Sequence, residues 1–483
     1  MEPLLTVDEM RAQDAAAIQK GIPEVVLMEH AALGLVCALE ERFAGILPSC
    51  RGIVLAGPGN NGGDALAVAR ILWLKGVRNF EVVLTGESAS NLAKKHLAVL
   101  LTLKVPIAKQ LPDSVDWIVD GIYGTGLSKP PEGVARRCIE WANTMTPRPW
   151  VVCADIPSGL DGDTGQPVGL AIDGSMTVTF GFLKRGLVTA RAANYVGQLR
   201  LDPIQIPRDG GEFSTFLFEA GDIALPRRPE ASHKGTFGSV KFWCGEKPGA
   251  ALLAAGAAMR TGVGLVAVVG EEKALAQVED RINPEILVEQ WNGAVGAAAM
   301  GVGPGMGVHE FDRLEELLEK TVALVLDADA TTIIAGDPQR FIPLIKERRS
   351  ITVMTPHPKE AGRLLGEMDV EMDRFAAVKK LSDTFGCPVL LKGKGTLVAC
   401  PEEPTVVVWE GNPALARGGA GDLLTGIVAG FLAQGMGGRE ALILGAHLEG
   451  AAALEVTRRR GASRTPSISE ISDALATVID GYR

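Results

Sequence analysis

Residues 52–74 read GIVLAGPGNNGGDALAVARILWL, and this stretch decides the fold of the first half of the chain. The apolar run at 52–56 predicts a strand, and residues 65–74 predict a helix. Glycines within 57–63 lie between them, where they would let a ligand approach the backbone. A strand, a glycine-rich loop and a helix in this order are typical of α/β domains built on a parallel sheet.

The same alternation continues on both sides of this stretch. A capping box formed by Thr6 and Glu9 predicts the start of a helix that runs towards Gln19. A further helix and four strands are predicted, at 92–103 and at 80–84, 116–119, 150–154 and 176–180. Continuous apolar strands between helices indicate a parallel sheet that is covered on both faces.

The pattern breaks between Leu201 and Lys234, where prolines, paired glycines and paired arginines gather. We place a domain boundary near 208–213, which predicts domains at 1–212 and 213–483. A long loop inside one domain is the alternative. The alternation then restarts, with strands and helices predicted at 239–244, 249–260, 264–269, 323–326, 351–354, 388–391, 405–409 and 421–433. The sequence therefore predicts a second α/β domain.

Composition excludes several classes of protein. The 483 residues include 58 glycines without a period, which excludes collagen, and 47% are hydrophobic, which excludes a disordered chain. The net charge is −10 and no long run of Lys or Arg occurs, so we expect no nucleic-acid partner. Seven scattered cysteines are typical of core residues in a reducing compartment. The acidic first residues and the lack of a long apolar segment predict a cytoplasmic protein without a membrane partner.

Acidic residues follow two further predicted strands of the first domain. Asp120 and Asp155 each end an apolar run, and the glycine-rich loop ends a third. Ligands of open parallel sheets bind at the carboxyl ends of the strands, where a partly desolvated carboxylate can act as an acid or a base. The loop alone could be a tight connection and each Asp a helix cap, but three such ends favour an anion-binding site. Asn61, Asp120 and Ser158 offer hard oxygens that suit an alkali or alkaline-earth cation.

Three motifs of this domain closely resemble the NAD(P)H-hydrate epimerase family. They are GPGNNGGDALAVAR at 57–70, VDGIYGTGL at 119–127 and DIPSGLDGDTG at 155–165, and LMEHAA at 27–32 is similar to the LMExAG pattern of that family. The resemblance covers about residues 1–210. It implies a Rossmann-like domain that interconverts the R and S forms of hydrated NADH or NADPH.

This resemblance also implies residue roles. Asp155 would be catalytic and contact the hydrated nicotinamide, and Asn61, Asp120 and Ser158 would hold K⁺. Ala65 departs from the pattern, because glycine is usual there. The substrate would also be lined by Asn60, Asn61, Gly62, Gly63, Asp64, Gly124, Thr125, Gly126, Leu127, Ser128, Lys129 and Pro130.

The second half carries a motif that suits phosphoryl transfer. Residues 417–422 read RGGAGD and precede a predicted helix. Glycines at a helix start offer backbone N–H groups to a transferring phosphoryl group. Asp422, in the first helical turn, can accept a proton from an attacking hydroxyl beside them. The alternative is an acid that only stabilises the N-terminus of the helix.

The GAGD of residues 419–422 resembles that of ribokinase-like enzymes, and further motifs narrow the resemblance to the ADP/ATP-dependent NAD(P)H-hydrate dehydratase family. These motifs are HKGTFG at 233–238, VGPGMG at 302–307, LDADA at 326–330, TPHPKE at 355–360 and LKGKGT at 391–396. The resemblance spans about residues 230–483. It implies a ribokinase-like domain that uses a nucleotide to remove water from the S hydrate.

Here too the resemblance implies residue roles. Asp422 would be the catalytic base that activates the ring hydroxyl for phosphorylation, and Mg²⁺ would accompany ADP or ATP. Glu246 and Ala420 depart from the family, where serine or threonine is common. The hydrate would contact Ala250, Gly305, His357 and Asp422. The adenine nucleotide would contact Lys392, Gly393, Lys394, Gly395, Thr396 and Gly421.

Both resemblances lead to one expectation, a bifunctional nicotinamide-nucleotide repair enzyme. Its ligands would be hydrated NADH and NADPH with ADP or ATP, and we expect a homo-oligomer. A ribokinase-like kinase for a vitamin or sugar, with a fused nucleotide-binding domain, is the alternative among enzymes. A nucleotide-binding regulatory or scaffold protein is the alternative of another class.

Overall fold

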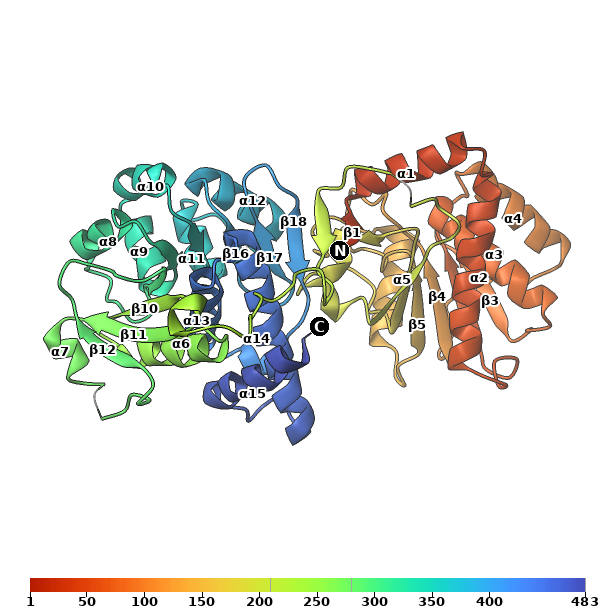
Figure 1. Cartoon of the computed structure of the whole chain (residues 1–483). Helices are drawn as coiled ribbons and strands as arrows, with labels where there is room; N and C mark the ends of the chain where they lie inside the picture. Colours follow the sequence, from red (N-terminus) through yellow and green to blue (C-terminus); the bar gives the residue numbers. More distant parts are fainter. Residues whose placement is uncertain (209, 279, 483) are drawn as a thin grey trace. The chain divides into compact units, whose positions relative to one another are not determined.

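A computed structural model describes residues 1–208, 210–278 and 280–482 (Figure 1). The chain forms two compact units: Pro3–Ser214, called the N-terminal unit here, and Met1–Glu2 with Thr215–Arg483, called the C-terminal unit. The division lies just after the boundary region predicted at 208–213, in which Asp209 is outside the described residues. No helix of the described chain is long and apolar enough to cross a membrane.

The N-terminal unit is built on a parallel sheet. The chain also forms a short parallel strand pair, β1 (Glu2–Leu5) with β7 (Leu183–Lys184). The strand order of the sheet is β3 (Phe80–Leu84), β2 (Gly52–Ala56), β4 (Trp117–Gly121), β5 (Trp150–Ala154), β6 (Met176–Phe180) and β8 (Gln198–Asp202). Because the chain leaves β2 to one side and returns at β4 on the other, the carboxyl ends of these two strands flank a switch point, where α/β sheets bind ligands.

Helices cover both faces of this sheet. Alternate residues of β4 show it: Val119 packs into a core with α2 and α3, whereas Ile118 packs into a second core with α5. The predicted capping box is present, since the Thr6 side chain accepts from Glu9 N while the Glu9 side chain accepts from Thr6 N. The helices are α1 (Val7–Gln19), α2 (Glu24–Arg42), α3 (Asn60–Leu74), α4 (Asn91–Thr102) and α5 (Gly133–Thr144).

The C-terminal unit is built on a longer sheet. Its strands pair in parallel from β12 to β16, and β17 and β18 continue it in antiparallel pairs. The strand order is β12 (Leu287–Gln290), β11 (Leu265–Gly270), β10 (Ser239–Cys244), β13 (Ala299–Val302), β14 (Ala323–Leu326), β15 (Thr352–Met354), β16 (Val389–Leu391), β17 (Thr396–Ala399), β18 (Thr405–Val408) and β9 (Thr215–Leu217).

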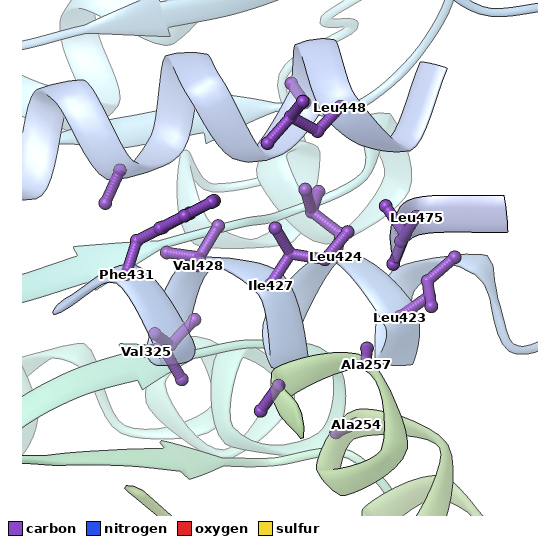
Figure 2. Packing of buried hydrophobic residues seen from close by; sticks show 14 of the residues in the cluster. Ala254, Ala257, Val325, Leu423, Leu424, Ile427, Val428, Phe431, Leu448 and Leu475 are labelled. Atoms are coloured by element: carbon purple, nitrogen blue, oxygen red, sulfur yellow. The ribbon is translucent and has the colours of Figure 1, made fainter. Parts of the chain in front are cut away.

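The core of this unit surrounds α13. Every residue of α13 from Leu423 to Ala433 is buried, and Figure 2 shows Ile427 and Phe431 of this helix packed among side chains of neighbouring elements. Val325 of β14 faces this core, while Leu324 and Leu326 are buried on the opposite face. The helices are α6 (Pro248–Arg260), α7 (Glu272–Leu275), α8 (Phe311–Leu318), α9 (Ala328–Gly336), α10 (Pro338–Glu347), α11 (Pro358–Leu364), α12 (Arg374–Phe385), α13 (Ala420–Ala433), α14 (Gly438–Arg460) and α15 (Ile468–Gly481).

The predicted fold class, two α/β domains whose parallel sheets are covered on both faces, is confirmed. The predicted start of α3 is wrong by five residues, and those of α4, α6 and α13 are wrong by one residue each. α3 begins at Asn60 and not at Ala65, because the glycine-rich loop itself forms the first turn. A Cβ on Gly62 would lie 1.9 Å from the Gly57 carbonyl oxygen, so only glycine permits this turn. Similarly, α13 begins at Ala420, one residue before the predicted Gly421.

Candidate active sites

A cleft of about 580 Å³ lies at the carboxyl end of the N-terminal sheet. Its walls come from α1, α2 and the segments that follow β2, β4 and β5. Within the described chain, the predicted residues outside this lining are Gly62, Gly63, Ser128, Lys129 and Pro130. The predicted residues that line it are Asn60, Asn61, Asp64, Gly124, Thr125, Gly126, Leu127 and Asp155.

Asp155 is held in a strained position at the end of β5. Its φ is 65°, a left-handed conformation that side chains rarely adopt. Its Oδ1 accepts hydrogen bonds from Lys184 Nζ at 2.5 Å, Thr179 Oγ1 at 3.2 Å and Phe180 N at 3.2 Å. The Lys184 side chain is only 1% exposed. The described residues offer Oδ2 no hydrogen bond, so this oxygen is available to a ligand in the cleft.

Further carboxyl groups line the same cleft. Burial, aided by Asp155 and Glu24 and opposed by Lys184, raises the pKa of Asp14 on α1 to about 6. Burial together with Asp155, Asp14 and Glu24 raises the pKa of Asp64 well above its usual range. The raised pKa values bring these carboxyl groups closer to holding a proton near neutral pH, which suits them to donate one to a substrate oxygen.

Two of the three residues predicted to bind a cation, Asp120 and Ser158, are in direct contact. Ser158 Oγ donates to Asp120 Oδ1 at 2.6 Å, and Ser158 N donates to Asp120 Oδ2 at 2.8 Å. Burial raises the pKa of Asp120, although its hydrogen bonds to Ser158 and Ile122 lower it. Asn61 lies against Gly124, and its buried Nδ2 has no partner among the described residues. The donor set is one carboxylate, one hydroxyl and one amide.

The GAGD motif forms the start of α13 in the C-terminal unit. Gly419 has a φ of 98°, which turns the chain into the helix. Asp422 lies in the first turn, and nothing within the described residues holds its carboxylate by a hydrogen bond or ion pair. Burial raises the pKa of Asp422 to about 6, with Asp327 adding to the effect and Lys392 opposing it. Such a carboxylate is mostly ionised at neutral pH and able to accept a proton.

Lys392 is the charged centre beside this carboxylate. Its Nζ donates to Asp327 Oδ1 at 2.6 Å, and Thr425 Oγ1 of α13 donates to Asp327 Oδ2 at 3.0 Å. A Cβ on Gly421 would lie 3.1 Å from Lys392 Nζ, so glycine lets the ammonium group approach the helix start. The structure thus brings together three predicted residues, Lys392, Gly421 and Asp422, with two that had no predicted role.

The predicted nucleotide loop at 391–396 is fixed by a buried arginine. Arg374, at the start of α12, donates to Lys394 O at 2.8 Å and to Lys392 O at 3.1 Å. Gly393 has a φ of 135° and lies so close to Arg374 that a Cβ would come within 2.9 Å of the guanidinium group. Lys394 Nζ lies 4.0 Å from the ring centroid of Trp409. Arg374 therefore helps to fix the backbone of this loop.

Two of the four residues predicted to contact the hydrate are neighbours. Gly305 and Ala250 meet at the N-terminus of α6, where Lys247 N donates to Gly305 O at 2.9 Å and Ala250 N donates to Lys247 O at 3.1 Å. Glu246, which departs from the family pattern, packs its side chain over Gly307, where a Cβ would lie 2.8 Å from the carboxyl carbon.

His357 lies at the N-terminus of α11 and caps it. Its Nδ1 accepts from the N–H groups of Lys359 at 3.1 Å and Glu360 at 3.4 Å. Burial, together with the charge of Lys392, lowers the pKa of His357, so the imidazole is neutral at neutral pH. This cap gives His357 a structural role, and its contact with a hydrate stays a prediction.

Comparison with known proteins gives a family for both units. Residues 24–186 match the YjeF-related protein N-terminus family, and residues 242–474 match the NAD(P)H-hydrate dehydratase family. The bifunctional NAD(P)H-hydrate repair enzyme Nnr of Moorella thermoacetica is 34% identical over 99% of this chain and 96% of its own length. The chain belongs to the family of bifunctional NAD(P)H-hydrate repair enzymes.

Other members of this repair family are similar to the chain over most of its length. The bifunctional repair enzyme Nnr of Escherichia coli is 32% identical over 89% of this chain and 85% of its own. A solved structure of an ADP/ATP-dependent NAD(P)H-hydrate dehydratase from Bacillus subtilis, co-crystallised with ATP and Mg²⁺, is 28% identical with a TM-score of 0.48 and covers 54% of this chain and 95% of its own. The family predicted from the motifs is confirmed for both halves of this repair enzyme.

Sequence reasoning missed several residues that build the two sites of the repair enzyme. Lys184 and Arg374 fix other predicted residues, and Asp14 lines the first cleft. A lone lysine that ends the apolar run FGFLK at 180–184 was a usable signal, because a buried ammonium group needs an anionic partner. Asp14 and Arg374 lie in ordinary amphipathic helices and carried no such signal.

Proposed function

We propose that the chain epimerises the R and S hydrates of NADH and NADPH in its N-terminal unit and dehydrates the S hydrate in its C-terminal unit at the expense of ADP or ATP. The observation that supports this most strongly is that a relative named as a bifunctional NAD(P)H-hydrate repair enzyme aligns over 99% of the chain, and each unit has its own candidate site. We expect both to act in the cytoplasm, in a homo-oligomer.

For the N-terminal unit we assign the hydrated ring to the cleft at Asp155 and the nucleotide to Asn60–Asp64 and Gly124–Pro130. Inversion at the hydroxyl-bearing carbon needs proton transfer in both directions at that oxygen. The proton is supplied and later removed if the carbon–oxygen bond breaks, and removed and later returned if the ring carbon–nitrogen bond breaks. Asp155, oriented by Lys184, and the carboxyl groups of Asp14 and Asp64, whose pKa values are raised, can perform both transfers. Asn61, Asp120 and Ser158 would hold K⁺, whose preference for hard oxygen ligands fits this set, and its charge would attract the substrate phosphates.

For the C-terminal unit we assign the nucleotide to Lys392–Thr396 and Gly421, and the hydrate to Ala250, Gly305, His357 and Asp422. The Asp422 carboxylate takes the proton of the ring hydroxyl as that oxygen bonds to the terminal phosphorus and the nucleotide diphosphate or monophosphate leaves. Phosphate then departs with the carbon–oxygen bonding pair, and loss of a proton from the adjacent ring carbon restores NAD(P)H. Mg²⁺ would enter with the nucleotide and neutralise its phosphate charge.

One assay tests both steps. The purified chain is mixed with a racemic hydrate, ADP and Mg²⁺, and NADH is followed by its absorbance. Full return that requires the nucleotide supports the proposal. Return of about half the signal contradicts epimerisation, because only the S form would then react. A stable phosphorylated product from a vitamin or sugar hydroxyl, without return of NADH, would favour the kinase alternative instead.

A further inference from the structure

A buried acid with an unpartnered oxygen lies behind the nucleotide loop. Glu449 belongs to the apolar stretch AHLEGAAAL of α14, at residues 446–454, and has no role in the steps above. It is 8% exposed, and its Oε1 has no hydrogen-bond partner among the described residues. Burying a carboxylate in this way is costly unless the group is neutral or is compensated by a positive charge.

The charges nearest to Glu449 are those of the nucleotide site. Burial raises the pKa of Glu449 to about 8, with Lys392 opposing the effect and Asp327 adding to it. Burial lowers the pKa of Lys392, but Asp327, Glu360 and Glu449 more than offset this and raise it, so Lys392 stays an ammonium group. The charged groups that act on Glu449 are Lys392 after β16 and Asp327 after β14. Glu360 on α11 acts on the same lysine, α13 with Asp422 packs against α14, and His447 of α14 pairs with Glu410 after β18.

The charge of Glu449 determines how strongly Lys392 can attract a phosphate group. With Glu449 neutral, the ammonium group is hydrogen-bonded to one carboxylate, that of Asp327, at 2.6 Å. With Glu449 ionised, a second buried negative charge competes with an incoming phosphate for the same ammonium group and repels that phosphate directly. We propose that Glu449 is a positioning residue for Lys392 and must be neutral for the nucleotide to bind.

This inference rests on the proposed nucleotide site, and direct binding of ADP with Mg²⁺ tests it separately from turnover. Calorimetry on the full chain between about pH 6.5 and 9.5 should give a constant Kd up to about pH 8. Above that pH, affinity should fall by about tenfold per pH unit, because each bound nucleotide then requires one proton. Glu449→Gln, which is neutral at every pH, should match the wild type near pH 7 and bind at least about tenfold more tightly at pH 9.5.

Glu455→Gln is the matched control, because it makes the same change on α14 at a carboxylate that pairs with Arg458 and Arg459. It should keep the wild-type pH dependence. Burial lowers the pKa of Lys394, so this lysine also loses charge at alkaline pH, but it does so in all three proteins and cancels in the comparison.

Two results would overturn the inference. One is an unchanged loss of affinity at alkaline pH in Glu449→Gln. The other is weak binding by this variant at pH 7 in a protein with native circular dichroism, which would mean that the ionised carboxylate is required. If Glu449→Gln does not fold, Glu449→Met carries the same expectation, since it is also neutral and of similar length. Absence of ADP binding in every protein at every pH would refute the nucleotide site itself, and with it this inference.

Discussion

Lys184 and Lys392 have the same role in the two candidate sites, because each binds a carboxylate. Each is a lysine with little solvent exposure that holds a carboxylate at the end of a parallel strand, Asp155 at 2.5 Å and Asp327 at 2.6 Å. Removing one partner of a buried pair leaves an uncompensated charge, which typically costs about 3–5 kcal/mol. These two lysines therefore fix the geometry of the acids at each site and also contribute to the stability of their units.

Replacing Lys184 tests the first of these pairs. Lys184→Met should slow interconversion of the R and S hydrates by about 10²-fold or more, because Asp155 loses the group that orients it for proton transfer. Chromatography that separates the two hydrates measures the rate. Dehydration of pure S hydrate by the same chain is the internal control and should be unchanged. Loss of both activities together would contradict a role confined to the N-terminal site.

The pKa of Asp422 predicts the acid limb of the pH profile for dehydration, where kcat falls as the pH is lowered. Because the base must be ionised to accept a proton, kcat should fall as pH drops below about 6, the value to which burial raises this pKa. Asp422→Asn should lower kcat by about 10²–10⁴-fold and remove that limb from the residual rate. Binding of ADP at neutral pH should persist in this variant. An Asp422→Asn protein that dehydrates the hydrate at the normal rate would exclude Asp422 as the base.

At the scale of elements, strong apolar patterns predicted the bounds of several strands correctly. The strands β2, β3, β5, β6 and β10 have the bounds expected from their sequences. The start of α3 was missed because glycines have low intrinsic helix propensity. The close approach of Gly62 to the Gly57 backbone shows why glycine is needed in this first turn. Short strands such as β7 and β17 carry too few residues for a periodic pattern.

The candidate sites were predictable to the extent that their residues follow strands. The glycine-rich loop, Asp120 and Asp155 converge because the carboxyl ends of parallel strands share one edge. Lys184, Arg374 and Glu449 were not predictable as partners, since they reach the sites through contacts between elements far apart in sequence. A single sequence therefore predicts which strand ends lie at one edge of the sheet better than it predicts which charged side chains contact the site there.

The contact between α6 and α13 predicts opposite effects for one substitution at two glycines. A Cβ at Gly426 of α13 would lie 2.1 Å from the Ala254 carbonyl oxygen of α6, whereas a Cβ at Gly256 of α6 would meet only Arg260, at 3.8 Å. Gly426→Ala should therefore lower the free energy of unfolding by about 2 kcal/mol or more. Gly256→Ala should raise it by about 0.5–1 kcal/mol through helix propensity. Urea denaturation of the two variants measures both, and equal effects would contradict this packing (Figure 2).

At the scale of the whole molecule, each candidate site draws its residues from one unit. The lining of the first cleft falls within Pro3–Ser214, and Asp327, Lys392 and Asp422 fall within Thr215–Arg483. The substrate of the second step can therefore reach it through solution.

This independence predicts complementation between two inactive variants. Asp155→Asn alone should stop at about half return of NADH from a racemic hydrate, and Asp422→Asn alone should return almost none. An equimolar mixture of the two should restore full return, because the S hydrate made by one protein is consumed by the other. Absorbance at completion measures the yield. A mixture that stops at half would mean that the hydrate passes between sites only within one chain.

The left-handed backbone of Asp155 has an evolutionary consequence. Glycine adopts a φ of 65° without the cost of about 1–2 kcal/mol that a side chain incurs there, so a chain with glycine at 155 and an apolar residue in place of its buried partner Lys184 would be the more stable one. Natural selection for repair and laboratory selection for heat resistance would then favour different residues at position 155. A library that varies positions 155 and 184 together and is screened only for survival at high temperature should enrich glycine at 155 with an apolar residue at 184, and yield proteins that leave half of every racemic pool unrepaired.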